Sequence, residues 1–129
     1  MLVLGLGDDL AYGGTGRDIL IGDDGIDIAY FGGSSAAVNV NLETGRGQGG
    51  EAENEIIVFV ENLIGSAFAD VLTGNDGVTS FVGGEGDDQL FGQGGNDKLD
   101  GGKGGDTLDG GDGIDDVESS EVGDQQHDQ

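Results

Sequence analysis

The chain has 129 residues, 30 of them glycine, and a formal net charge of −23 at pH 7. The absence of cysteine excludes a disulfide framework and a thiolate zinc site. Because so acidic a surface repels phosphate groups, and because no apolar run approaches the ~20 residues of a membrane span, we expect neither a nucleic-acid partner nor a membrane-spanning segment.

A first block of repeats covers residues 4–39. Gly13–Ile21 and Gly22–Tyr30 follow the nine-residue pattern G-G-x-G-x-D-x-U-x, in which U is an apolar residue. The next nine residues keep Val38 at the apolar position but have Ala36 where the pattern requires Asp. High charge and abundant glycine are also typical of disorder, but a regularly spaced apolar residue favours a folded repeat.

Residues 40–55 break this period, and we expect them to form an irregular linker or a wider coil. The alternation in 37–42 predicts a strand, the glycine-rich run 43–50 a loop, and the apolar run 56–60 a buried strand. The whole chain, 1–129, is expected to form a single domain.

The second block covers residues 56–118, and a polar tail follows at 119–129. Three of its repeats are degraded: two have Glu61 and Thr79 at the Asp position, and the third has Phe68 where a glycine is expected. Its four best copies begin at Gly83, Gly92, Gly101 and Gly110.

These repeats resemble the RTX family of hemolysin-type calcium-binding nonapeptide repeats. The resemblance implies an all-β fold, a right-handed parallel β-roll (a β-helix or solenoid), with several Ca²⁺ ions between its turns. It also implies a module that folds on binding extracellular calcium, within a longer bacterial protein that is secreted by the type I route and contributes flanking domains.

The residue types agree with such a roll. Glycines allow the first six positions to turn tightly, and positions seven to nine alternate as a short strand with U pointing inward. Two repeats would make one coil, so that residues 18 apart stack. The predicted inward residues are Ala11, Leu20, Ala29, Leu72, Phe81, Leu90, Leu99, Leu108 and Val117.

Stacking would also align the aspartates of position six. Asp70, Asp88 and Asp106 would form one column, while Asp97 and Asp115 would form another below Thr79. Such columns repel unless a cation neutralises them, and calcium takes six to eight oxygen ligands from carboxylates and carbonyls. The competing interpretation is that these aspartates only stabilise turns.

The expected metal ligands are therefore the position-six aspartates and the glycines whose carbonyls face them. The aspartates are Asp9, Asp18, Asp27, Asp70, Asp88, Asp97, Asp106 and Asp115. The glycines are Gly14, Gly16, Gly83, Gly84, Gly86, Gly95, Gly101, Gly102, Gly104, Gly111 and Gly113. Asp124 is in phase with them, but its repeat lacks the leading glycines.

We expect no enzymatic activity. The only histidine, His127, lies in the polar tail, and there is no HExxH or GxSxG motif. An adhesin-like or a carbohydrate- or ice-binding roll is the alternative function. No regular threonine row supports ice binding, whereas Tyr12 and Tyr30 share position nine of stacked repeats.

The N-terminal repeats have apolar residues at their outward positions, unlike the C-terminal ones. Either residues 43–60 cover this face, or the strands are buried on both sides, or the face contacts a preceding domain, a ligand or a second copy of the chain. The outward residues are Leu10, Tyr12, Ile19, Ile21, Ile28 and Tyr30.

Overall fold

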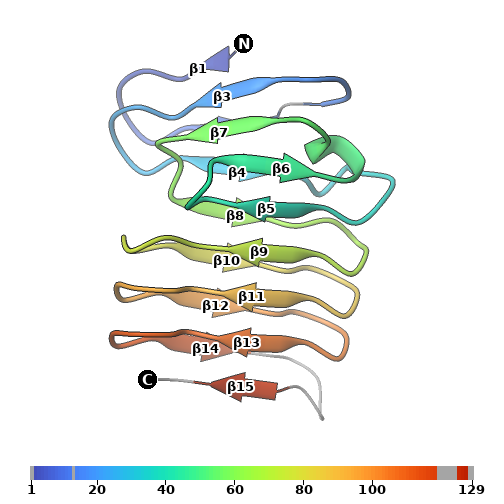
Figure 1. Ribbon diagram of the computed structural model, residues 1–129, viewed down its shortest axis with the longest axis vertical. Coiled ribbons are helices and arrows are strands. Elements are labelled where there is room, and N and C mark those ends of the chain that lie inside the picture. Colours follow the sequence, from blue (N-terminus) through green and yellow to red (C-terminus); the bar gives the residue numbers. More distant parts are fainter. Residues whose placement is uncertain (1, 13, 119–124, 128–129) are drawn as a thin grey trace.

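The computed structural model describes residues 2–12, 14–118 and 125–127. The chain winds into a parallel β-roll, a flattened solenoid whose coils stack along its long axis from the N-terminal to the C-terminal end (Figure 1). Each coil contributes one short strand to each of two facing sheets, which we call sheet A and sheet B.

In the described part of the chain, sheet A has nine strands and sheet B has six. In spatial order, sheet A consists of β1 (Leu2–Val3), β3 (Ile19–Ile21), β7 (Ile56–Val58), β6 (Arg46–Gln48), β5 (Asn39–Asn41), β9 (Val71–Thr73), β11 (Gln89–Phe91), β13 (Thr107–Asp109) and β15 (Gln125–His127). Sheet B consists of β2 (Leu10–Ala11), β4 (Ile28–Tyr30), β8 (Asn62–Ile64), β10 (Ser80–Val82), β12 (Lys98–Asp100) and β14 (Asp116–Glu118).

The predicted spacing of one coil is confirmed in the C-terminal block. Phe81 pairs with Leu99, and Leu90 pairs with Leu108, each 18 residues further along the chain. All these strand pairs are parallel, and each strand consists of positions seven to nine of its repeat. The period of nine therefore sets both the position and the register of the strands.

The predicted inward residues form the core. Eight of the nine are fully buried, and Val117 is partly buried and packs against the others. A column of leucines, with Phe81 among them, fills the narrow space between the sheets, and truncating one of these side chains to alanine would cost about 2–5 kcal/mol. Val40, Ile57 and Leu63 extend the core through the irregular part of the chain.

Residues 40–55, which separate the two blocks of repeats and which we call the inserted segment, differ from the prediction. Residues 43–50 are not simply a loop, because they contain β6, which pairs antiparallel with both β5 and β7. Gly47 makes this possible: a Cβ there would lie 2.7 Å from the carbonyl oxygen of Ala52, in the short 3₁₀ helix η1 (Gly50–Ala52). In place of the expected wider coil, the inserted segment adds the antiparallel strand β6 to sheet A; we call β6 with its two flanking turns the excursion.

The predicted phase of residues 31–39 is wrong by two residues. Val40, rather than Val38, is the inward residue that pairs with Leu72. Val38 is buried at the position of an aspartate, and its N–H donates to the Asp70 carboxylate. The strand moves by two residues because the nine-residue period is not kept between Phe31 and Asn39, the first residue of β5.

The inserted segment does not cover the N-terminal apolar face. Strands β6 and β7 join sheet A edge to edge, between β3 and β5. The outward residues of β3 and β4 are half-buried, whereas Leu10 is 50% and Tyr12 is 60% exposed. The Tyr12 and Tyr30 rings contact each other, with centroids 4.9 Å apart.

Candidate calcium sites

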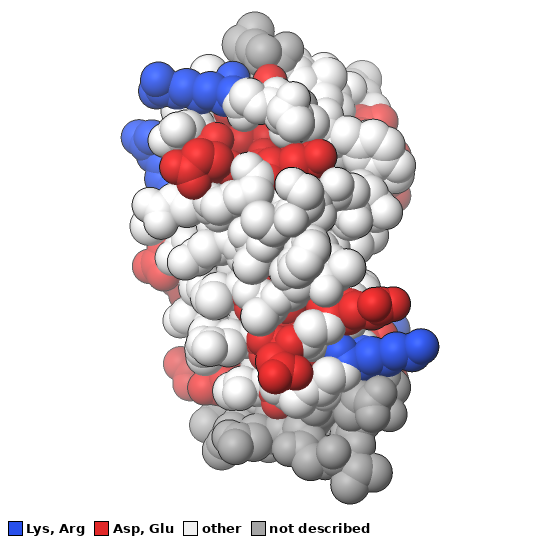
Figure 2. Space-filling model, turned by 90° about the vertical axis from the view of Figure 1, so that its right-hand side faces the viewer, with Lys and Arg blue, Asp and Glu red and all other residues white. Residues whose placement is uncertain are grey.

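Negative charge is concentrated along the edges of the roll. Figure 2 shows one such edge, on which Asp and Glu side chains gather in two groups separated by an uncharged band. Only 4 Lys and Arg residues oppose 27 acidic ones in the whole chain. Most of this charge therefore has no basic side chain to neutralise it.

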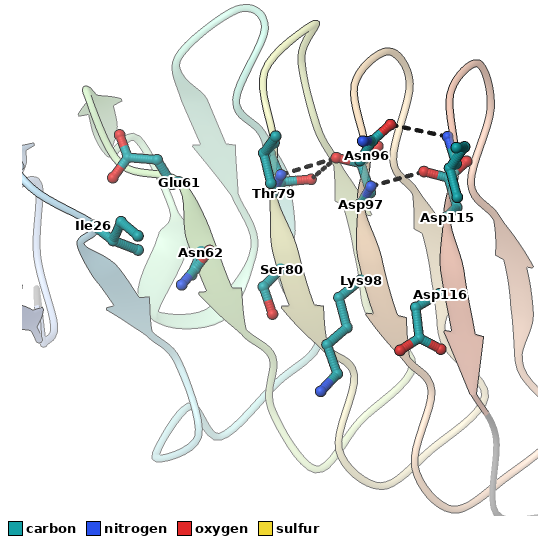
Figure 3. Close-up of a pocket in the computed structure, with 12 residues that line it drawn as sticks. Ile26, Glu61, Asn62, Thr79, Ser80, Asn96, Asp97, Lys98, Asp115 and Asp116 are labelled. Atoms are coloured by element: carbon teal, nitrogen blue, oxygen red, sulfur yellow. Dashed lines mark hydrogen bonds between the residues drawn. The ribbon is translucent and has the colours of Figure 1, made fainter.

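The position-six aspartates stack in two columns, as predicted. In each column the backbone N–H of one aspartate donates to Oδ1 of the aspartate one coil further on. This bond measures 2.8 Å from Asp70 to Asp88, from Asp88 to Asp106, and from Asp97 to Asp115. We call this series of bonds the carboxylate ladder; Figure 3 shows its sheet B side.

The ladder continues into the N-terminal block. The N–H of Asp9 donates to Asp27 Oδ1 over 3.0 Å, so these two predicted ligands, 18 residues apart, stack as the coil spacing requires. Thr79 takes an aspartate's place, and both its N–H and its hydroxyl donate to Asp97 Oδ1 over 2.9 Å (Figure 3). Asp124 lies outside the described residues.

The second oxygen of these carboxylates is buried. Oδ2 of Asp9, Asp18, Asp27, Asp88 and Asp97 is shielded from solvent and has no hydrogen-bond partner. A buried carboxylate oxygen without a donor or a cation costs several kcal/mol, because it has lost its water without replacement. These oxygens are therefore available to a cation.

In the C-terminal block, the glycine at position one lies beside both an aspartate Oδ2 and a carbonyl oxygen of the next coil. A Cβ built on Gly83 would lie 2.5 Å from Asp88 Oδ2 and 2.8 Å from the Gly101 carbonyl oxygen. Gly65 is flanked in the same way by Asp70 Oδ2 at 2.5 Å and the Gly83 carbonyl oxygen at 2.8 Å. Any side chain at position one would fill this space, so glycine keeps an oxygen-lined gap between coils.

Glycines at positions two and four bring successive coils together. Gly102, Gly104 and Gly113 have positive φ, and a Cβ on each would collide with a glycine carbonyl of the preceding coil. Gly84, Gly86, Gly95 and Gly111 likewise have positive φ and lie against the preceding coil. Beside Gly14 and Gly16, by contrast, a Cβ would meet no atom within 4 Å.

Asp70 differs from the other predicted ligands. Its Oδ2 accepts from the Ser66 N–H over 2.7 Å, and its Oδ1 accepts from the Ser66 hydroxyl over 2.6 Å and from the Val38 N–H over 2.8 Å. Both oxygens therefore already have donors. An ion between Asp70 and Asp88 would have to share the Asp70 carboxylate with Ser66.

Burial has a strong effect on the protonation of the ladder. Desolvation by burial raises the pKa of Asp88 to about 8. The negative charges of Asp70 and Asp106 add to this rise, whereas the hydrogen bond from the Asp70 N–H opposes it. Desolvation also raises the pKa of Asp27 and of Asp97. In the absence of an ion, burial thus shifts these carboxyl groups toward their protonated form.

The carboxylate and carbonyl oxygens between the coils are of the types that calcium binds, and carbonyls would supply much of its coordination shell. Within the described ranges, no three acidic or histidine side chains converge on one point. Each site would therefore combine the carboxylates of two coils with glycine carbonyls, which are ligands that calcium accepts at 2.3–2.6 Å. The residues present fit the ion that the repeat pattern implies.

Two glutamates that directly precede a strand, Glu55 and Glu61, were not predicted as ligands. Glu61 occupies the Asp position of its repeat, and its Oε1 accepts from the Asp27 N–H over 2.9 Å. Glu55 directly precedes β7, as each aspartate precedes its strand, but it lies outside the repeat frame. Desolvation, with the Asp18 and Glu51 charges adding to it, raises the pKa of Glu55 to about 7.

A second series of bonds runs along position five. Side-chain oxygens of Asp8, Asp87 and Asn96 accept from backbone N–H groups 18 residues further along, at Ile26, Gly105 and Ile114, over 2.7–2.9 Å. The sequence signal for this series was that Asp8, Asp87 and Asn96 all stand at position five of their repeats. These exposed bonds hold the turns in register without a cation.

Thr79→Asp would restore the missing carboxylate of the sheet B ladder. We expect the variant to bind one additional calcium ion, or to bind calcium more tightly at Asp97, because the new carboxylate would lie between Glu61 and Asp97. Isothermal titration calorimetry gives the number of ions. Ser80→Asp, which adds the same charge on the outward face of β10, is the control; an equal effect of both variants would contradict the ladder register.

Comparison with known families agrees with this geometry. The family model described as the RTX calcium-binding nonapeptide repeat matches four copies over residues 2–33, 59–78 and 82–117. No curated protein sequence matches the chain significantly. No helix in the described part of the chain has the length and apolarity to cross a membrane. The family matches leave out most of the inserted segment, where the structure also departs from the repeat. The chain belongs to the family of RTX calcium-binding nonapeptide repeats.

Proposed function

We propose that the chain is a folding module of a secreted bacterial protein, and that it folds when it binds several calcium ions between stacked coils. The observation that carries this proposal is the series of buried Oδ2 atoms without hydrogen-bond partners. A fold that buries these charges without donors or cations is unstable, and each ion that binds only the folded state stabilises it. At a calcium concentration tenfold above Kd, the gain is about 1.4 kcal/mol per site.

The low calcium of a bacterial cytosol would then keep the chain unfolded for export, and the higher calcium outside would fold it. The role proposed is structural rather than catalytic. The ligands are the position-six aspartates and the glycine carbonyls named above. We further predict that the chain has flanking domains, that it is secreted by the type I route, and that its N-terminal apolar face allows self-association.

The test is a calcium titration followed by far-ultraviolet circular dichroism at pH 7.5. In EGTA we expect a largely unstructured chain, because the charge of −23 opposes compaction. Calcium should induce β structure with a midpoint of about 10⁻⁴–10⁻³ M, the range of extracellular modules. Magnesium, which demands a smaller octahedral shell, is the control ion and should not replace calcium. A β spectrum that persists in excess EGTA would contradict the proposal.

A further inference from the structure

Glu55 is a fully buried glutamate outside the nonapeptide pattern. Its exposed fraction is 0%, and neither Oε1 nor Oε2 has a hydrogen-bond partner. The residue directly precedes β7, and the next residue, Ile56, pairs with Ile19 at the start of β3. Glu55 and Asp18 therefore occupy equivalent positions on neighbouring strands of sheet A.

Glu61, which belongs to the ladder, accepts a bond that Glu55 lacks. Glu61 Oε1 accepts the N–H of Asp27, the aspartate on the preceding strand of its sheet, over 2.9 Å. Glu55 makes no such bond to Asp18. Here the two segments are connected through the backbone, by the Ile56 N–H donating to the Asp18 carbonyl over 3.0 Å. Both oxygens of the buried Glu55 carboxylate are left for another ligand.

Asp18 supplies a second oxygen of the same kind. Its Oδ2 is buried and has no hydrogen-bond partner, although the residue as a whole is half-buried. The Asp18 carboxylate is also close enough to act electrostatically on Glu55. Two such groups held side by side repel each other unless a cation lies between them.

The nearby basic residues do not serve as that cation. Arg17 and Arg46 line a recess of about 300 Å³ together with Glu55, but both side chains are exposed. Since neither Glu55 oxygen accepts a hydrogen bond, neither guanidinium pairs with the carboxylate. Both arginine side chains therefore remain exposed to water.

We propose that Asp18 and Glu55 together bind a further divalent cation, calcium by the chemistry of its oxygen ligands, at the junction of the N-terminal repeats and the inserted segment. This inference rests on the proposed function, but one ligand comes from outside the repeats. Backbone carbonyls or water complete the shell. The ion joins β7 to β3, and so fixes the antiparallel excursion to the roll.

Glu55→Gln tests the site, because it keeps the shape of the side chain and removes the charge. We expect the variant to bind one calcium ion fewer than the unaltered chain, as counted by calorimetry and by equilibrium dialysis. Its stability in saturating calcium should fall, because the variant lacks an ion that binds only the folded state. Glu43→Gln, an exposed residue of the same segment, is the control and should change neither property.

Asp18→Asn provides an independent second variant. It should lose the same ion, so that the double variant Asp18→Asn/Glu55→Gln loses one ion and not two. If Glu55→Gln does not fold, hydrogen exchange of Asp18→Asn in saturating calcium is the deciding measurement. The Gly47 and Ile57 amides, which donate to Glu55 and Gly45, should exchange faster in this variant than in the unaltered chain.

The possible outcomes separate the two proposals. If the unaltered chain binds no calcium, the proposed function fails, and this inference fails with it. If that chain binds calcium and Glu55→Gln binds the same number of ions, only the Asp18–Glu55 site is overturned. An additive loss of two ions in the double variant would also overturn it, because the residues would then belong to different sites.

Discussion

Gly83→Ala is expected to impair calcium binding and to destabilise the calcium-bound roll, although it adds only one methyl group. The new Cβ would lie 2.5 Å from Asp88 Oδ2 and 2.8 Å from the Gly101 carbonyl oxygen, two of the atoms expected to bind calcium. Neither atom can move freely, because Asp88 Oδ1 is engaged in the ladder and Gly101 is part of the next coil. Overpacking of this kind typically costs about 1–3 kcal/mol, to which the loss of bound calcium is added.

Gly33→Ala is the matched control for this substitution. Gly33 lies in an exposed turn, its φ is not positive, and a Cβ there would meet no atom within 4 Å. Thermal unfolding in saturating calcium, together with the calcium midpoint from circular dichroism, should show a lower Tm and a higher midpoint for Gly83→Ala alone. If the two alanine variants behave alike, the gap at position one does not hold an ion.

The repeated part of this fold is predictable because a translation of 18 residues maps each coil onto the next. Once the period is known, the inward position of Leu90, its pairing with Leu108 and the stacking of Asp88 on Asp106 follow from strand geometry alone. The nine-residue sequence period arises from this structural repeat. The prediction is therefore correct wherever the period continues.

Where the period is broken, the same reasoning fails for identifiable reasons. Glycines at 45, 47, 49 and 50 are typical of a loop, yet Gly47 lies within β6 because a close contact with Ala52 requires glycine there. Asp18 and Glu55 are 37 residues apart rather than 18, so no periodic argument brings them together. The usable signal was local: an acidic residue immediately before the short apolar strand Ile56–Val58.

Protons and calcium should each favour this fold and should compete with each other, because both neutralise the same buried carboxyl groups. The pKa of Asp88 is about 8 in the ion-free fold, against about 3.9 for an unfolded aspartate. The folded state therefore binds more protons than the unfolded state between these values, so its stability falls as pH rises from about 4 to about 8. The raised pKa of Glu55, about 7, acts in the same direction up to that pH.

In calcium-free buffer we accordingly expect little β structure at pH 8 and a partial gain of β structure at pH 5. The calcium concentration at the midpoint of folding should rise on acidification, because protons compete with calcium for the carboxyl groups. Circular dichroism measures both, in buffers freed of calcium by a chelating resin and kept above the pI of about 4.1. Asp88→Asn, a neutral mimic of the protonated group, should weaken this pH dependence more than the exposed control Asp24→Asn, which removes the same charge. An ion-free chain with more β structure at pH 8 than at pH 5 would show that these carboxyl groups do not limit folding.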